Sequence, residues 1–491
     1  MLGRISIINF FFFGTIFYSA CNKEFQGTDA GNQLPETYTL IDTIIRIGDD
    51  RLTSQVNLQW WGNDADGLIQ GYEFSFDSVI TDETIWIYTE KQDSIFILAP
   101  EAGEDTADFI FHIRAIDNYG EKDASPARLI IPVKNSPPII SIIPGINNPI
   151  KSFPVIKYFW SASDPDGNEN ISQFELYFND TTNTAFILNQ SVSSATFAAQ
   201  DPVVDLLSCN VYANASSLPE EIQIEGLIGD AWNRLWIRAI DQSGAKSNFA
   251  VSDSIYIKKV KSNILFVDGY ASASPISFYK NGFSAVGFNT IDTIQIFEKV
   301  GGIYTQQSAD NLTQEKIFSL FDVIVWFSND ANNSLSLAQK TTTTFFNDGG
   351  KMLMSVYISS SFDPLSNFLD FTPISSLTDP EDTTLILDLA AQLLPDDLSF
   401  PTLQASSIVS IVKPLELQTG AEVLYQAELT AKDNATLTFS DWNGNSVIIA
   451  KKKNLSGNTN FVFSALELQK LDGLATMNLF FEKILLDEFG L

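Results

Sequence analysis

The sequence WWGNDADG at residues 60–67 returns as WSASDPDG at residues 160–167, and each copy is followed by a second shared motif. This second motif reads RAIDNYG at residues 114–120 and RAIDQSG at residues 238–244. The first motif repeats after 100 residues and the second after 124, so the later copy carries 24 additional residues between its motifs. We assign these to residues 201–229, which are rich in Ser, Asn and Pro. The chain therefore contains two domains of one kind.

Both copies contain short segments with the pattern of half-buried strands. Aromatic residues alternate with polar ones over residues 71–77, and residues 109–116 place their apolar side chains on one face. Residues 174–179 and 235–240 follow related patterns. A period of two is typical of a sheet with one buried face. Short strands joined by turns over roughly 100 residues predict two antiparallel β-sandwiches.

These motifs resemble those of bacterial fibronectin type III domains. The resemblance rests on the tryptophan before Asp-x-Asp-Gly, the Tyr-Glu or Phe-Glu strand after it, and the Arg-Ala-Ile-Asp-x-x-Gly strand end. It covers residues 36–134 and 137–259, the second with the insertion, and it implies the immunoglobulin-like sandwich fold.

The Asp-x-Asp-Gly turn allows two interpretations. Closely spaced carboxylates are hard oxygen ligands, so a calcium site would use Asp64, Asp66, Asp164 and Asp166. The longer Asp-x-Asp-x-Asp-Gly loop with a distal glutamate is absent, however. Aspartate and glycine are also what a tight turn between strands requires. We favour the structural turn and keep calcium as the alternative.

From Asn263 onward the pattern changes to strands that are apolar throughout. Such strands occupy residues 264–267, 323–327 and 352–356. Strands buried on both faces are typical of parallel sheets covered by helices. Residues 261–491 are therefore predicted to form a three-layer α/β sandwich with a mainly parallel sheet.

Two helices are predicted within this α/β domain. One covers residues 334–346, with Ser334 or Asn333 as its N-cap, and the other covers residues 476–486.

The order of elements in this domain resembles the class I glutamine amidotransferase-like superfamily, which has a flavodoxin-like α/β fold. The features that carry the resemblance are an opening strand that ends in Asp268-Gly269, the strand FDVIV at residues 321–325, a helix, and GGK at residues 349–351. The resemblance implies a cysteine nucleophile directly after the Gly-Gly strand and a histidine later in the chain. Residues 354–359 hold neither cysteine nor glycine, and no histidine follows them.

A Cys-His or Ser-His catalytic pair therefore cannot be assembled in the α/β domain. The chain has one histidine, His112, which lies in the first sandwich, opposite Phe111 and Ile113 in the strand alternation. We predict a surface position for it. Cys209, which is one of two cysteines, is predicted to be a small buried apolar residue.

One candidate ligand site remains in this domain. Ligands of parallel α/β sheets gather at the carboxyl ends of the strands. The residues at these positions offer hydroxyls, amides, carboxylates and aromatic rings, which suit a sugar or another polar ligand; they are Asp268, Tyr270, Ser328, Asn329, Asp330 and Tyr357.

The beginning of the chain predicts export. One arginine precedes an apolar run at residues 5–17, which is too short to span a bilayer and ends in Tyr-Ser-Ala before Cys21. This pattern resembles the lipobox of bacterial lipoproteins, which implies removal of residues 1–20 and attachment of lipid to Cys21. An ordinary secretory signal is the alternative. Residues 21–35 are predicted to be a polar tether, and the absence of an aspartate after Cys21 favours the outer membrane by the same resemblance.

Composition limits the partners. The 491 residues suggest about three domains, and 45% hydrophobic residues are enough for packed cores. A formal charge of -31 repels nucleic acid and anionic lipid head groups.

These observations predict a noncatalytic cell-envelope lipoprotein, exposed at the surface or facing the periplasm, that acts in binding or assembly. Its partners would be the membrane, through the lipid anchor, and a glycan or an envelope protein. Apart from calcium, no cofactor is implied. The alternative is a glycan- or peptide-directed hydrolase that uses carboxylates in the α/β domain.

Overall fold

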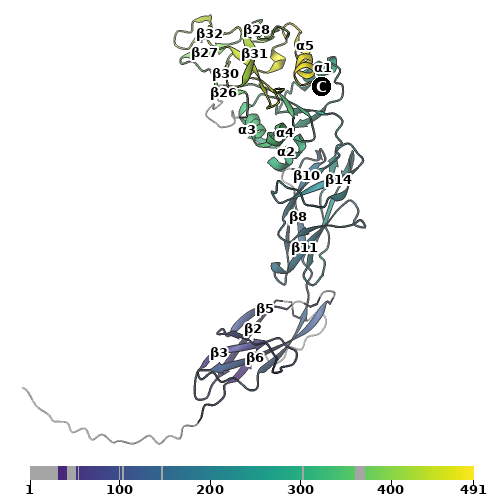
Figure 1. Cartoon of the computed structure of the whole chain (residues 1–491), viewed down its shortest axis with the longest axis vertical. Helices are drawn as coiled ribbons and strands as arrows, with labels where there is room; N and C mark the ends of the chain where they lie inside the picture. The colour runs from purple at the N-terminus through teal and green to yellow at the C-terminus, as the bar shows by residue number, and fades with distance from the viewer. Residues whose placement is uncertain are drawn as a thin grey trace, which may run out of the picture. The chain divides into compact units, whose positions relative to one another are not determined.

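The computed structural model describes residues 31–40, 51–52, 55–98, 100–101, 104–144, 148–300, 303–359 and 371–491. The predicted signal, Cys21 and most of the predicted tether lie outside the described residues. The chain divides into two compact units (Figure 1). Unit 1 contains Met1–Pro100 and Thr106–Lys134, and unit 2 contains Glu101–Asp105 and Asn135–Leu491. Each unit is described by itself.

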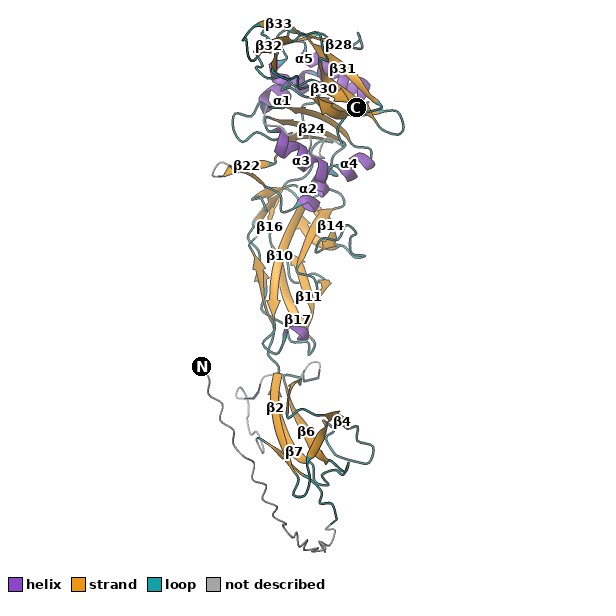
Figure 2. Ribbon diagram, turned by 90° about the vertical axis from the view of Figure 1, so that its left-hand side faces the viewer, coloured by secondary structure: helices purple, strands orange, loops and turns teal. Residues whose placement is uncertain are grey.

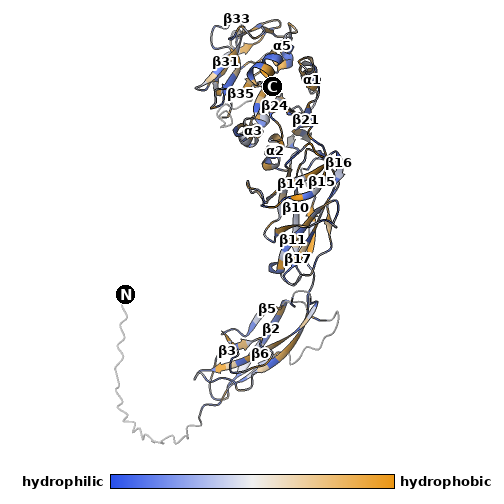
Figure 3. Ribbon diagram, turned by 45° about the vertical axis from the view of Figure 1, so that its right-hand side comes forward, coloured by the Kyte–Doolittle hydropathy of each residue, from blue (hydrophilic) through white to orange (hydrophobic). Residues whose placement is uncertain are grey.

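Unit 1 is an antiparallel β-sandwich. One sheet has the order β1-β2-β5, with β1 (Glu36–Thr39), β2 (Gln55–Asn63) and β5 (Asp93–Ile97). The other has the order β4-β3-β6-β7, with β3 (Ile69–Ser75), β4 (Ile87–Thr89), β6 (Thr106–Asp117) and β7 (Ala127–Lys134). Buried and exposed residues alternate along most of β2, and Figure 3 colours this sandwich by hydropathy. Its apolar face forms the core around Trp60 and Phe111.

Unit 2 begins with a second antiparallel β-sandwich. One sheet has the order β15-β14-β13-β10-β8, with β8 (Ile139–Ile143), β10 (Val155–Ser163), β13 (Ser194–Ala199), β14 (Leu206–Ala213) and β15 (Ile224–Ile228). The facing sheet has the order β12-β11-β17-β18, with β11 (Ile171–Phe178), β12 (Phe186–Asn189), β17 (Leu235–Asp241) and β18 (Ala250–Val251). Three short strands form a further sheet: β9 (Lys151–Ser152), β16 (Ala231–Asn233) and β19 (Ile255–Ile257). The pairings confirm the prediction of two antiparallel sandwiches.

The 24 additional residues of the second copy extend its sheet. In the first sandwich, β5 pairs with β2. In the second, β13 takes the equivalent place beside β10, and β14 and β15 continue the sheet beyond it. The predicted insertion is therefore built into the fold as two paired strands.

The C-terminal domain contains a mixed sheet. In the described part of residues 261–491, nine strands have the order β21-β20-β24-β25-β35-β34-β31-β28-β29. The strands on the parallel side are β20 (Ile264–Asp268), β21 (Asp292–Gln295), β24 (Val323–Ser328), β25 (Lys351–Val356) and β35 (Thr459–Ser464). The antiparallel side adds β28 (Gln392–Pro395), β29 (Leu403–Gln404), β31 (Ala421–Ala427) and β34 (Val447–Lys453). Only the first half of the sheet is parallel, which differs from the predicted mainly parallel sheet.

Apolar residues of the central strands pack against helices on both faces of the sheet. Phe266 and Val325 share one cluster with α1 (Ile276–Ala285) and α5 (Met477–Glu482). Leu265 and Trp326 share another with α2 (Asn311–Phe318), α3 (Ala331–Thr341) and α4 (Thr343–Asn347), and Figure 2 shows the helices around the sheet. No described helix is both long and apolar enough to cross a bilayer.

The predicted helix at residues 334–346 begins earlier and is divided. Asp330 is the N-cap of α3, because its Oδ1 accepts a hydrogen bond from the backbone N–H of Asn333 at 3.1 Å. The helix ends before Thr342, and α4 follows. At the C-terminus, α5 continues as a π-helix, η5 (Lys483–Glu488).

Three smaller sheets accompany the nine-stranded sheet in the described part of this domain. They are the hairpin β22 (Phe297–Val300) and β23 (Ile303–Gln306), the pair β26 (Ile374–Leu377) and β30 (Leu415–Leu417), and the sheet of β27 (Thr383–Ile386), β32 (Thr430–Asp433) and β33 (Phe439–Asp441). Short 3₁₀ helices are η2 (Asn168–Asn170) and η4 (Leu468–Lys470).

The second sandwich and the C-terminal domain share a continuous hydrophobic cluster inside unit 2. Phe153, from the sandwich, meets Phe321 edge to face with 5.2 Å between ring centroids. Lys157 Nζ lies 2.5 Å from Asp310 Oδ2, and the Lys157 side chain is almost completely buried. Sandwich and C-terminal domain therefore pack as one body.

The predictions for the positions of Cys209 and His112 have different outcomes. Cys209 is completely buried on β14, as predicted. His112 was predicted at the surface, and this is wrong, because the side chain is only 7% exposed. Burial lowers the pKa of His112, with a further contribution from the positive charge of Arg128.

Candidate functional site

The candidate site lies at the carboxyl ends of four adjacent parallel strands. The sheet order places β20, β24, β25 and β35 side by side, so Asp268, Ser328, Val356 and Ser464 end neighbouring strands. Such an edge is where ligands of α/β sheets bind.

Asp268 ends β20 and is 8% exposed. Its Oδ1 accepts a hydrogen bond from the backbone N–H of Tyr270 at 2.9 Å. Burial raises the pKa of Asp268, although hydrogen bonds from Ser274 and Tyr270 act in the opposite direction. A buried carboxyl with a raised pKa is the kind of group that acid catalysis uses, so it deserves a direct test.

At the same edge of the sheet, the buried Tyr270 forms a hydrogen bond with Glu467. Tyr270 Oη donates a hydrogen bond to Glu467 Oε1 at 2.6 Å. Gln469 Nε2 donates to Tyr270 Oη at 3.0 Å and to Glu467 Oε1 at 3.2 Å. Lys470 forms an ion pair with the other oxygen of Glu467. Burial and the hydrogen bond to Glu467 raise the pKa of Tyr270. The glutamate is thus held by partners from its own domain.

Ser355, on β25, lies in the stretch where the resemblance would place a nucleophile. Its hydroxyl is buried and forms a hydrogen bond with the Tyr279 hydroxyl at 3.1 Å. It also donates to the carbonyl oxygen of Leu466 and accepts from the N–H of Leu468, both at 3.1 Å. These bonds tie β25 to the segment after β35, which is a structural role.

The other predicted site residues serve local structure. Ser328 Oγ donates to the Gly269 carbonyl at 3.1 Å and accepts from the Asp330 N–H at 3.0 Å. Asp330 caps α3. Asn329 is exposed, and the half-buried Tyr357 donates its hydroxyl to the Ile411 carbonyl at 3.4 Å. The structure therefore brings Asp268, Tyr270 and Ser328 to one edge of the sheet. The other predicted residues do not join them: Asp330 caps α3, Asn329 is exposed, and Tyr357 contacts the Ile411 carbonyl.

Glu467, Gln469 and Lys470 are the residues that the sequence interpretation missed. They follow β35, whose apolar run at residues 461–463 has the same character as the three strands that were recognised. That run was the available signal, because the residues directly after a parallel strand belong to the same sheet edge.

The aspartates of both repeats hold the segment that enters each sandwich. In the first, Asn32 Nδ2 donates to Asp117 Oδ2 at 2.5 Å, and the backbone N–H of Gln33 donates to Asp66 at 3.1 Å.

The second repeat has the same contacts. Asn135 Nδ2 donates to Asp241 Oδ2 at 2.6 Å, and the Ser136 N–H donates to Asp166 Oδ2 at 2.7 Å. We call this arrangement the entry clamp, formed by Asp66 with Asp117 and by Asp166 with Asp241.

The first aspartate of each Asp-x-Asp-Gly turn closes the turn itself. The N–H of Asp66 donates to Asp64 Oδ1 at 3.3 Å, and that of Asp166 donates to Asp164 Oδ1 at 2.8 Å. The second oxygens of Asp64 and Asp164 are buried without a hydrogen-bond partner among the described residues. Gly167 has a φ of 115°, which glycine adopts readily.

Asp164 is the most perturbed of these carboxyls. Burial raises its pKa to about 6, and the charges of Asp166, Asp241 and Glu169 add to the effect. No group of three or more His, Cys, Asp or Glu side chains in the described ranges is placed to hold a metal ion.

Comparison with known proteins gives no family. No protein-family model matches the chain, and no curated protein matches it in sequence. Among solved structures, the fibronectin(III)-like modules of Clostridium thermocellum CbhA are 12% identical, with 45% of this chain and 94% of that chain covered and a TM-score of 0.17. A two-domain fibronectin type III segment of chicken tenascin is 10% identical, with 46% and 99% covered and a TM-score of 0.19. The fibronectin type III-like description of the two sandwiches rests on the strand pairings above.

Proposed function

We propose that this chain is a noncatalytic lipoprotein of the cell envelope that acts in binding or assembly. Residues 1–20 are removed on export, Cys21 carries the lipid, and residues 21–35 form the tether to the outer membrane. The sandwiches at 36–134 and 137–259 carry the domain at 261–491, which contacts a glycan or an envelope protein. The chain faces the periplasm or the cell surface.

The proposal of a noncatalytic function rests on the hydrogen bonds of the polar groups at the strand ends. Glu467 has a tyrosine, an amide and a lysine as partners, and the Ser355 hydroxyl is bonded on both sides. A general base or a nucleophile needs a free position toward a substrate. These groups stabilise their own domain instead.

We also propose that residues 261–491 form a three-layer α/β domain of the glutamine amidotransferase-like class without its catalytic residues. The parallel strand order β21-β20-β24-β25-β35 and the helices on both faces support this proposal. The segment contains neither cysteine nor histidine.

One observation favours the alternative, a hydrolase that uses carboxylates. Burial raises the pKa of Asp268, which is the direction that the general acid of glycoside hydrolysis needs. Its partner carboxylate would be Glu467, since both charges act on Tyr279.

The experiment that separates the two functions is an activity assay on the purified chain with envelope glycans and peptides. We expect no turnover from the wild type, and equal binding of any retained glycan or peptide by the wild type and Asp268→Asn. Asp396→Asn, which changes an exposed carboxylate of the same domain, is the matched control. Turnover that Asp268→Asn abolishes and Asp396→Asn leaves unchanged would establish the hydrolase.

A further inference from the structure

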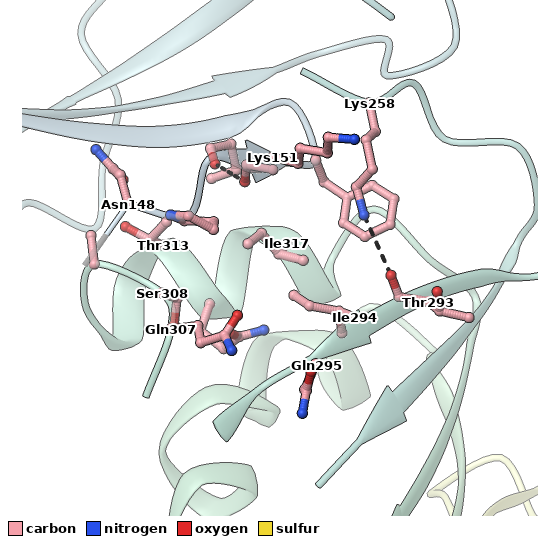
Figure 4. A pocket seen from close by; sticks show the side chains of 16 residues that line it. Asn148, Lys151, Lys258, Thr293, Ile294, Gln295, Gln307, Ser308, Thr313 and Ile317 are labelled. Atoms are coloured by element: carbon pink, nitrogen blue, oxygen red, sulfur yellow. Dashed lines mark hydrogen bonds between the residues drawn. The ribbon is translucent and has the colours of Figure 1, made fainter. Parts of the chain in front are cut away.

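A cavity lies between the second sandwich and the C-terminal domain, inside unit 2. Its volume is about 100 Å³. The sandwich contributes β9, the residues around it and Lys258, whereas the C-terminal domain contributes β21 and α2. Figure 4 shows Lys151 and Lys258 on one side, with Ile317 of α2 and Ile294 of β21 across from them.

The charge of the lining is opposite to the charge of the chain. The described residues that line the cavity include two lysines, Lys151 and Lys258, and no Asp or Glu. The whole chain carries a formal charge of -31. A positive pocket on an acidic protein attracts anions that the remaining surface repels.

Neither lysine has a carboxylate in direct contact within the described residues, although the charge of Asp292 acts on Lys258. Within the described residues, Lys151 and Lys258 form no ion pair. Lys258 Nζ donates to the Thr293 carbonyl at 3.4 Å and lies 3.9 Å from the centroid of the Phe153 ring. An ammonium group has three donors, so two remain for a ligand. Half-buried and unpaired, this charge is one that an anion would stabilise.

A second donor in the lining has no partner. Gln314, on α2, is 1% exposed, and its Nε2 forms no hydrogen bond with any described residue. A buried amide donor without a partner is unfavourable unless a ligand or water accepts its hydrogen bond. Phe153, Ile294 and Ile317 supply apolar surface beside these donors.

The walls of the cavity are held in place by contacts around it. The ion pair between Lys157 and Asp310 joins β10 to the N-terminus of α2, and the Phe153–Phe321 contact closes the apolar side. Lys316, also on α2, lies 4.8 Å from the centroid of the Tyr212 ring. A site held in this way does not have to be ordered when a ligand binds.

We propose that this cavity binds a small organic carboxylate. The carboxylate group accepts hydrogen bonds from Lys258 and Gln314, Lys151 adds charge at the entrance, and a short apolar part contacts Phe153, Ile294 and Ile317. The volume limits the ligand to roughly five to eight non-hydrogen atoms. Because both domains form the walls, the ligand stabilises their contact. This inference goes beyond the proposed function and does not depend on lipid attachment or on the strand-end residues.

The test uses 2-methylpropanoate as the probe and saturation-transfer difference NMR on the chain from residue 22 onward. The uncharged 2-methylpropanamide, which has the same shape, is the matched ligand. We expect the carboxylate to bind with a dissociation constant in the millimolar range, at least tenfold more tightly than the amide, and more weakly as salt increases. Equal binding of the two ligands, or no saturation transfer to either, would overturn the proposal.

Variants locate the site. Lys258→Met should weaken carboxylate binding at least tenfold, and Gln314→Met should weaken it severalfold. Lys280→Met, which removes an exposed lysine on α1 outside the cavity, should leave binding unchanged. Lys151→Met is the second lining variant, because its exposed side chain can change without loss of folding. Binding that survives both Lys258→Met and Lys151→Met contradicts the assignment.

Discussion

Two glutamates hold equivalent positions in the two sandwiches. Glu73 accepts hydrogen bonds from Arg114 and Lys122, and Glu175 accepts them from Arg238 and Lys246. The arginines also lie over aromatic rings. Burial by itself would raise the pKa of Glu175, but the bonds from Lys246 and Arg238 outweigh it and lower the pKa.

We predict that Glu175→Gln lowers the free energy of unfolding at pH 7 by about 2 kcal/mol, because two cations lose their partner. The lowered pKa means that the wild-type contribution is present above the unfolded value of about 4.3 and is lost as the pH falls through the folded value. Urea unfolding from pH 3 to pH 7 measures both effects. Glu220→Gln, at an exposed position, should change neither, and equal behaviour of the two variants would refute the prediction.

The contribution of Asp164 to stability depends on pH in the opposite sense to that of Glu175. Its folded pKa of about 6 lies above the unfolded value near 3.9, so the folded state holds the proton more tightly. Stability should therefore rise as the pH falls from about 6 to about 4.

We predict that Asp164→Asn raises the free energy of unfolding at pH 7 by about 1–2 kcal/mol in a chelating buffer, because it removes an ionised carboxylate beside Asp166 and Asp241. The wild type should melt at the same temperature with and without millimolar calcium. A wild type stabilised by calcium, with a variant that lacks this response, would favour the calcium interpretation of Asp64, Asp66, Asp164 and Asp166.

Among the elements, the inserted strand β14 contains a cysteine whose reactivity can report whether the strand opens. Cys209 points into the core of the second sandwich, and burial raises the pKa of its thiol to about 12. We predict that a thiol reagent labels Cys209 only at the rate of unfolding, since the thiolate is the reactive form.

The control is Leu206→Cys in a Cys209→Ala background, because Leu206 lies on the same strand and is 63% exposed. This thiol should react within minutes under native conditions. Rapid labelling of Cys209 in the folded wild type would show that β14 is not part of the stable sheet.

The elements that could be predicted are those with a clear local pattern. Strands such as β3 and β24 follow from the period or the apolar content of a few residues. The antiparallel strands β28 and β31 could not be placed, because pairing with distant segments decides their position in the sheet. Asp330 illustrates the same limit at the site, since an aspartate before a helix can bind a ligand or cap the helix, and it caps α3.

For the whole molecule, the contact between the second sandwich and the C-terminal domain was not foreseeable. Phe153 and Phe321 have the character of ordinary core residues, and nothing local marks them as partners. The two antiparallel sandwiches could be predicted, because the repeated motifs and the period of two are local features of the sequence.

We predict that Lys157 and Asp310 are energetically coupled. Burial by itself would raise the pKa of Asp310, but hydrogen bonds from Lys157 and Thr313 lower it. Lys157→Met and Asp310→Asn should together destabilise unit 2 by about 1–3 kcal/mol less than the sum of the single changes. Urea unfolding of the three variants measures this coupling, and strictly additive effects would contradict the contact.

We propose that a lipid on Cys21 anchors the chain to the envelope. Mass spectrometry of the mature N-terminus, on protein recovered from cell membranes, is the most direct test. We predict a chain that begins at Cys21 with the additional mass of acyl groups, and a Cys21→Ser variant that lacks this mass and is not retained in the membrane. A mature chain that begins elsewhere without acyl groups, or a Cys21→Ser variant with unchanged membrane retention, would contradict it.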